Sequence, residues 1–98
     1  MKIIREENNT SLILKLEGRL DTTTSKELET AINDSFEGKT DVELDFSKLE
    51  YISSAGLRVV LIAQKRMNKQ GNMKITNIND MVREVFEITG FMDILTIE

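Results

Sequence analysis

Two adjacent serines and a nearby glycine are the residues of this chain that are best suited to chemistry. Ser53 and Ser54 lie between an alternating stretch that ends in LEYI and an aliphatic run, LRVVLIA. A serine at such a junction could act as a nucleophile, cap a helix, help to hold an anion or accept a phosphoryl group. Gly56, two residues after Ser54, leaves space where another group can approach closely.

The composition argues against catalysis by these serines. The chain has no histidine and no cysteine, so it can build neither a Ser-His-Asp triad nor a metal site of thiolates and imidazoles. The G-x-S-x-G pattern of a nucleophile elbow and the G-x-x-x-x-G-K-[ST] pattern of a phosphate-binding loop are also missing. We therefore expect a protein that is not an enzyme and that has no cofactor and no metal.

Length and charge narrow the class further. With 98 residues, the chain has room for one domain, which we expect to span residues 1–98. The net charge is −4, from 13 basic and 17 acidic residues, which disfavours nucleic-acid binding. The longest apolar run, residues 59–63, is far shorter than the about 20 residues of a membrane span. No signal-peptide pattern precedes it, so we expect a cytoplasmic protein without a membrane partner.

Hydrophobic periodicity predicts an α/β fold in which helices cover a mixed sheet of four to five strands. The expected order is β-β-α-β-α-β-α-β. Strands are predicted at residues 2–6, 11–17, 41–46 and 73–76, and residues 94–98 could supply a last short strand or simply end the chain. Helices are predicted between Thr24 and Gly38, from Ser54 to about Lys69, and over residues 80–89.

Capping residues mark the expected helix starts. Thr24 and Glu27 have the spacing of a capping box, with Thr24 as N-cap and Glu27 at the third helical position. Ser54 is the expected N-cap of the second helix, and Asn79 that of the third.

The second helix is apolar nearly all round in its first two turns. One side can cover a sheet, and its members are Gly56, Val59, Val60, Ala63 and Met67. Three further apolar residues, Leu57, Leu61 and Ile62, flank Arg58 on the opposite side. Either neighbouring helices cover these side chains, or they form with Arg58 an exposed surface that binds a partner.

Three segments resemble the STAS domain of bacterial anti-sigma-factor antagonists. Gly18–Thr22 (GRLDT) is similar to the G-x-[LI]-D segment that ends the family's second strand. Residues 42–57 resemble its central strand, loop and phosphoserine motif, and residues 77–90 resemble its next helix. Together the segments cover nearly the whole chain.

The resemblance implies a function. In this family, the unphosphorylated protein binds an anti-sigma factor that is also a serine kinase, and binding releases the sigma factor. The kinase then phosphorylates the antagonist, which dissociates, and a PP2C-type phosphatase resets it. The phosphorylated serine corresponds to Ser54, with Asp21 and Gly56 near it. Ser53 stands where many members have aspartate, and it is the second candidate acceptor.

Two other functions fit the same residues. In the first, the chain is a constitutive STAS scaffold or sensor subunit that is never phosphorylated, and Ser54 is only a cap. In the second, the helix N-terminus binds a nucleotide or a small anion, although Arg58 is the one cation close to it in sequence.

Overall fold

The computed structural model describes residues 1–98, and it forms one α/β domain of four strands and three α-helices. The elements in chain order are β1 (Lys2–Asn8), β2 (Ser11–Leu20), α1 (Ser25–Ser35), β3 (Asp41–Ile52), α2 (Ser54–Gln70), β4 (Asn72–Thr76), α3 (Asp80–Thr89) and the 3-10 helix η1 (Phe91–Asp93). The predicted fold class is therefore confirmed.

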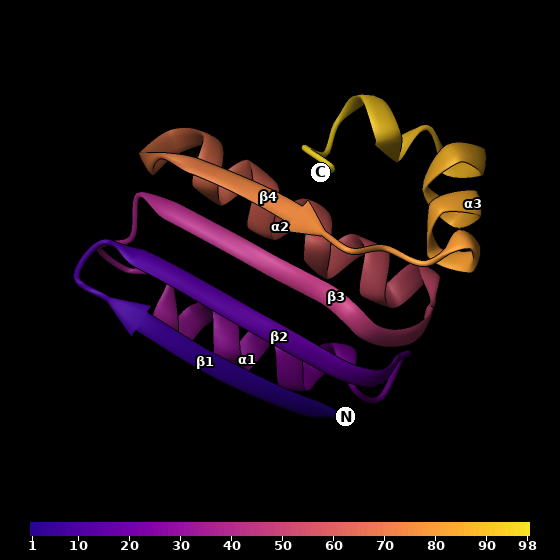
Figure 1. The fold of residues 1–98 in the computed structure, drawn as a ribbon, viewed down its shortest axis with the longest axis horizontal. Coiled ribbons are helices and arrows are strands. Elements are labelled where there is room, and N and C mark those ends of the chain that lie inside the picture. The colour runs from indigo at the N-terminus through magenta and orange to yellow at the C-terminus, as the bar shows by residue number, and fades with distance from the viewer.

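The sheet has the strand order β1-β2-β3-β4, so neighbours in sequence are also neighbours in space. β1 runs antiparallel to β2, whereas β2, β3 and β4 are parallel. Parallel strands need crossover connections, and these are nearly always right-handed. Because both crossovers step in the same direction along the sheet, α1 and α2 lie side by side on one face of it (Figure 1).

The first two strands form a β-hairpin. Asn8 pairs with Ser11 across a tight turn, in which Asn9 adopts the left-handed conformation with φ of 47°. Asparagine tolerates that conformation better than most residues. β1 lies at one edge of the sheet.

The predicted alternation places the core on the face that the helices cover. Every second residue is buried in the first part of β2 and of β3. The whole predicted inner side of α2 is buried too, Gly56 included. The buried members are Leu12, Leu14, Leu16, Val42, Leu44, Phe46, Val59, Val60, Ala63 and Met67. This pattern fixes the register of the strands, since a slip by one residue would turn the apolar set toward solvent.

β2 and β3 are longer than the sequence pattern predicts. Gly18 does not end β2; it takes a φ of +103° within the strand, and β2 continues to Leu20. The register of β2 against β3 shifts at two places, between Lys15 and Glu17 and again at Gly18. Such irregularities let a strand bend and continue out of simple alternation. The longer strands carry the chain directly to the two serines.

The predicted final strand is reduced to a single bridge. Ile75 of β4 pairs with Ile97 in parallel, through Ile75 N–H to Thr96 O at 2.8 Å and Glu98 N–H to Ile75 O at 2.9 Å. The ladder does not extend further because the Thr96 N–H points to the side chain of Gln64 on α2, at 3.4 Å.

Asn79 joins α3 to the sheet. As predicted, it is the N-cap of α3: its side-chain oxygen accepts from Val82 N–H at 2.8 Å. Its amide nitrogen also donates to Leu49 O of β3 at 2.9 Å. Phe86 of α3 packs against Phe46 of β3, with ring centroids 6.5 Å apart.

The face of the sheet that α1 and α2 leave open carries charged side chains. Lys15 forms an ion pair with Glu6 at 3.0 Å, and this hydrogen bond raises the pKa of Lys15. Burial acts to raise the pKa of Asp45, but hydrogen bonds from Ser47 N–H and the Asn77 amide outweigh it, so the pKa of Asp45 is lowered.

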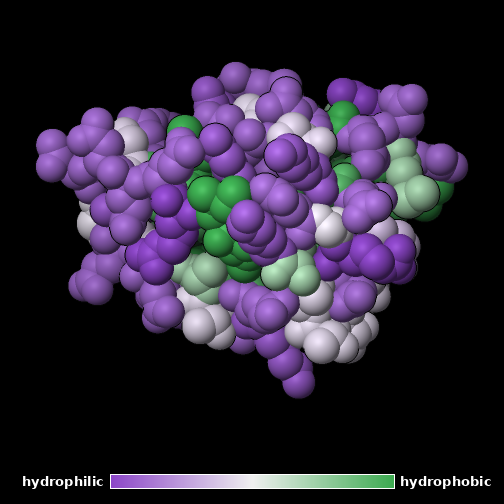
Figure 2. Space-filling model, turned by 60° about the horizontal axis from the view of Figure 1, so that its bottom comes forward, coloured by the Kyte–Doolittle hydropathy of each residue, from purple (hydrophilic) through white to green (hydrophobic).

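The view from the β1 side shows a mostly hydrophilic surface with a small apolar area near its centre (Figure 2). None of the helices combines the length and the hydrophobicity that crossing a membrane requires.

We predict that Asn79→Ala lowers the free energy of unfolding by about 2 kcal/mol, because it removes both a helix cap and a hydrogen bond to β3. Urea unfolding followed by circular dichroism measures the change. Asn33→Ala is the matched control, since Asn33 is exposed on α1 and should lose nothing. Equal stability of the two variants would contradict this role for Asn79.

Candidate phosphorylation site and partner-binding surface

The serine pair forms the junction between β3 and α2. Ser53 has extended backbone angles, and its hydroxyl oxygen accepts from Gly56 N–H at 3.3 Å. Ser53 is therefore the N-cap of α2, and the prediction that Ser54 caps this helix is wrong. Ser54 is instead the first helical residue, one position further on. The two residue types are identical, so only the backbone geometry distinguishes cap from first turn.

Ser54 is exposed, whereas Ser53 is half-buried. The first turn of α2 contains no acidic residue, so nothing on the helix offsets the partial positive charge of its N-terminus. An anionic group attached at Ser54 would meet a favourable field there.

Gly56 is buried against the end of β2. A Cβ atom at this position would lie 2.7 Å from the Leu20 side chain and 3.0 Å from Leu20 O. The same carbonyl oxygen accepts from Ser53 N–H at 2.9 Å. The group that lies close to Gly56 is thus Leu20 of the same chain. Because Asp21 follows Leu20, this contact also brings the Asp21 turn to the serine junction.

Asp21 organises the turn before α1. Its Oδ1 accepts from Thr23 N–H at 3.1 Å and Thr24 N–H at 3.0 Å. The Thr24 hydroxyl accepts from Asp21 N–H at 2.8 Å and donates to Arg19 O at 2.7 Å. Thr24 lies at the N-cap position but makes no side-chain cap, so the predicted capping box with Glu27 is wrong. The Thr24 hydroxyl is already engaged by Asp21 N–H and Arg19 O, and it does not reach back to the helix amides.

The hydrogen bonds to Asp21 favour its ionised form. The Thr24 N–H contributes most to lowering the pKa of Asp21, and the Thr24 hydroxyl, the Thr23 N–H and the charge of Arg19 act in the same direction. Arg19 itself stacks on the Tyr51 ring, with its guanidinium carbon 4.2 Å from the ring centroid. The turn beside the serines therefore carries a carboxylate that stays charged at neutral pH.

The predicted partner-binding surface is smaller than expected. Leu57 is only 5 % exposed and belongs to the core, so its assignment to the surface is wrong. Leu57 follows Gly56, where the first turn of α2 lies against Leu20 at the end of β2, and its side chain is part of the core. Arg58 is exposed, Leu61 is half-buried and Ile62 is 50 % exposed, so these three residues remain the candidate surface.

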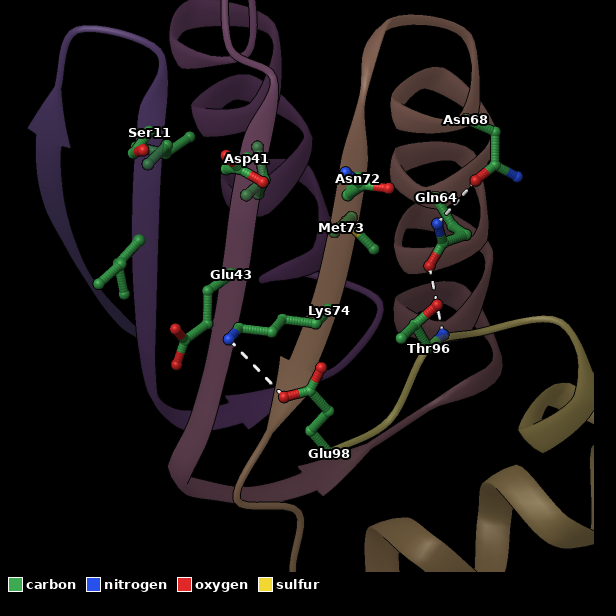
Figure 3. A pocket seen from close by; sticks show the side chains of 13 residues that line it. Ser11, Asp41, Glu43, Gln64, Asn68, Asn72, Met73, Lys74, Thr96 and Glu98 are labelled. Carbon is green, nitrogen blue, oxygen red and sulfur yellow. Dashed lines mark hydrogen bonds and ion pairs between the residues drawn. The ribbon is translucent and has the colours of Figure 1, made fainter.

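A large pocket lies away from the serines. It has a volume of about 580 Å³ and lies at the end of the sheet where β2, β3 and β4 begin, around Ser11, Asp41 and Asn72 (Figure 3). The serines follow the carboxyl end of β3, so they do not line it. Its polar side chains interact with one another: Lys74 with Glu98 at 3.7 Å, and Gln64 with Asn68 at 2.9 Å. No cluster of three or more potential metal ligands occurs in the chain.

We predict that Ser53→Ala destabilises the protein by about 1 kcal/mol through loss of the cap, while Ser54→Ala leaves its stability unchanged. Thermal unfolding of the two variants under identical conditions measures the difference. A larger loss for Ser54→Ala would place the cap at Ser54.

We also predict that Asp21 contributes to acid sensitivity. Its lowered folded-state pKa means that its stabilising effect is complete above the ordinary pKa of 3.8. The effect is lost as the pH falls through the folded-state value. Urea unfolding at a series of pH values should therefore show a weaker loss of stability in acid for Asp21→Asn than for the wild type. Asp34→Asn, at an exposed position of α1, should follow the wild-type curve; if Asp21→Asn follows it too, the assignment fails.

Comparisons with known proteins agree with this geometry. The family model of the STAS domain matches residues 2–98. BtrV of Bordetella bronchiseptica, described as a candidate anti-sigma factor antagonist, is 37 % identical over 99 % of this chain and 85 % of its own length.

Solved structures share the fold. An anti-sigma factor antagonist from Mycobacterium paratuberculosis superposes with a TM-score of 0.88 at 18 % identity, over 98 % of this chain and 83 % of that one. The anti-sigma factor antagonist SpoIIAA of Bacillus, solved unphosphorylated and phosphorylated, gives TM-scores of 0.77 and 0.76 at 20 % and 19 % identity. Both superpositions cover 99 % of this chain, and 87 % and 91 % of the SpoIIAA chains. With its family match, its fold and its relatives in agreement, the chain belongs to the STAS domain family of anti-sigma factor antagonists.

Proposed function

We propose that this protein binds an anti-sigma factor with serine kinase activity while it is unphosphorylated, and that phosphorylation of Ser54 ends the binding. The observation that carries the proposal is that one serine caps α2 while the other is exposed to solvent. Ser53 caps α2, so the exposed Ser54 is not needed for that role. A kinase could modify Ser54 without dismantling the helix.

The environment of Ser54 supports a switch. A phosphoserine carries about −1.5 to −2 charges at neutral pH, and the acid-free first turn of α2 would tolerate them. A docked partner would have to strip water from this phosphate, which opposes binding. The phosphate would also add its charge to that of the ionised Asp21 turn, so the partner would meet more negative charge than in the unmodified protein. The phosphorylated structure of SpoIIAA concerns a protein of the same fold.

Ser54→Ala should abolish phosphorylation by the cognate kinase and keep binding to it, whereas Ser54→Asp should bind about tenfold or more weakly. Phosphate incorporation and calorimetric titration measure the two effects. Ser53→Ala is the matched control: it should still be phosphorylated, at a site that peptide mass spectrometry places at Ser54.

Full phosphorylation of Ser54→Ala would overturn the choice of acceptor. Complete absence of a phosphopeptide covering residues 49–58 from cells under all growth conditions would favour the constitutive scaffold instead. A PP2C-type phosphatase should restore binding of the phosphorylated protein if the cycle operates.

A further inference from the structure

In this acidic protein, all the charged residues of α2 are basic. The helix carries four basic residues, Arg58, Lys65, Arg66 and Lys69, and no acidic residue. The chain as a whole has a net charge of −4, and both α1 and α3 contain acids. None of the ion pairs in the structure involves α2, so its cations have no carboxylate partner.

Three of these cations share one exposed line. At about 100° per residue, Arg58, Lys65 and Lys69 lie within about 40° of one another around the helix, and Ile62 lies beside them. All four are exposed, Ile62 by 50 %. We call this set the α2 basic stripe. Arg66 is not part of it, because it is half-buried and lies over the Phe36 ring at 5.8 Å.

The stripe lies between two flanks of α2 that the rest of the protein occupies. On one flank, Gln64 contacts the C-terminal segment through Thr96 N–H. On the other, Gln70 donates to the carbonyl oxygens of Phe36 and Lys39, each at 2.7 Å. The core covers the inner side. The stripe is therefore the part of α2 that nothing in the chain covers.

We propose that the α2 basic stripe is a docking surface for an acidic protein surface that also offers an apolar contact for Ile62. The unpaired cations of the stripe are complementary in charge to carboxylates on a partner, and they attract these carboxylates to the helix. Ile62 lies in the same line, and burying its exposed apolar area against a partner would favour binding. The proposal rests on the proposed function only for the identity of the partner, which is the anti-sigma factor.

Nucleic acid and anionic lipid fit these observations less well. Three exposed cations are few against the six to ten phosphate contacts that are typical of proteins bound to DNA. The remaining surface of a chain with net charge −4 would repel a polyphosphate. A protein surface needs only local complementarity, and it can cover Ile62.

The candidate phosphorylation site lies beside one end of the stripe. Ser54 lies one helical turn before Arg58 and on the same side of α2, since residues four apart are neighbours on a helix. A phosphate at Ser54 therefore pairs with Arg58 or cancels its charge, and it weakens the stripe at the end nearest the serine junction.

The test uses defined probes and backbone amide NMR of the ¹⁵N-labelled protein. The probes are a synthetic amphipathic helical peptide rich in Glu and Leu, polyglutamate, a 20-base-pair DNA duplex and vesicles of phosphatidylglycerol. We expect the Glu/Leu peptide to shift the amides of α2 and to bind more tightly than polyglutamate, and we expect neither DNA nor vesicles to bind more tightly than the peptide.

A pair of double variants isolates the stripe. Lys65→Glu with Lys69→Glu should weaken binding of the Glu/Leu peptide about tenfold, through lost attraction and added repulsion. Lys2→Glu with Lys26→Glu makes the same change in net charge at exposed positions outside α2, and it should bind like the wild type. Circular dichroism checks that both variants fold.

Peptide shifts outside α2, equal affinity of the two double variants, or tighter binding of DNA or vesicles would each overturn the proposal. The same variants are then titrated with the anti-sigma factor. If the wild type does not bind that protein while the peptide maps to α2, the proposed function fails and the stripe stands. If the wild type and both double variants bind it equally, the proposed function stands and the stripe falls.

Discussion

The close contact between Leu20 and the first turn of α2 is the constraint on which the site depends. The backbone of α2 can approach the end of β2 only because residue 56 has no side chain, since a Cβ would collide with Leu20. The bond from Ser53 N–H to Leu20 O holds the same junction. This single contact orients α2, aims Ser54 at solvent and places the Asp21 turn next to it. The proposed regulation by a phosphate depends on all three of these features.

Much of the fold follows from residue patterns. Alternating Leu residues in β2, and the spacing of Val59, Val60, Ala63 and Met67 in α2, state correctly which faces are buried. Asn79 is recognisable as a cap because asparagine is a preferred N-cap residue and it directly precedes the periodic segment that forms α3. The strand ends were not predictable in the same way. The register shifts near Gly18 interrupt the alternation, so a pattern of period two ends before the strand does.

The position of the serines between β3 and α2 was predictable from the sequence, but the local geometry of this junction was not. Ser53 and Ser54 have the same side chain, and only the backbone angles at residue 53 decide which of them caps α2. Thr24 has the right type and position for a cap, but its hydroxyl bonds within the Asp21 turn and leaves the helix amides without a side-chain cap. Leu57 cannot be told from Leu61 by type, although one is buried and the other is half-exposed. The lack of acidic residues on α2 is visible in the sequence. Which of its cations are exposed on one line becomes clear only when the structure shows which face of α2 is buried.

The bridge between Ile75 and Ile97 has a consequence for the solubility of the protein. An open sheet has two edges, and each offers unpaired backbone groups to any strand that arrives. At one edge, β1 carries the exposed charges of Arg5, Glu6 and Glu7, which repel incoming strands or keep them hydrated. At the other, Ile75 of β4 donates to Thr96 O and accepts from Glu98 N–H, so its backbone groups are paired. Residues 96–98 thus cover part of the β4 edge, where a strand of another chain could otherwise add to the sheet.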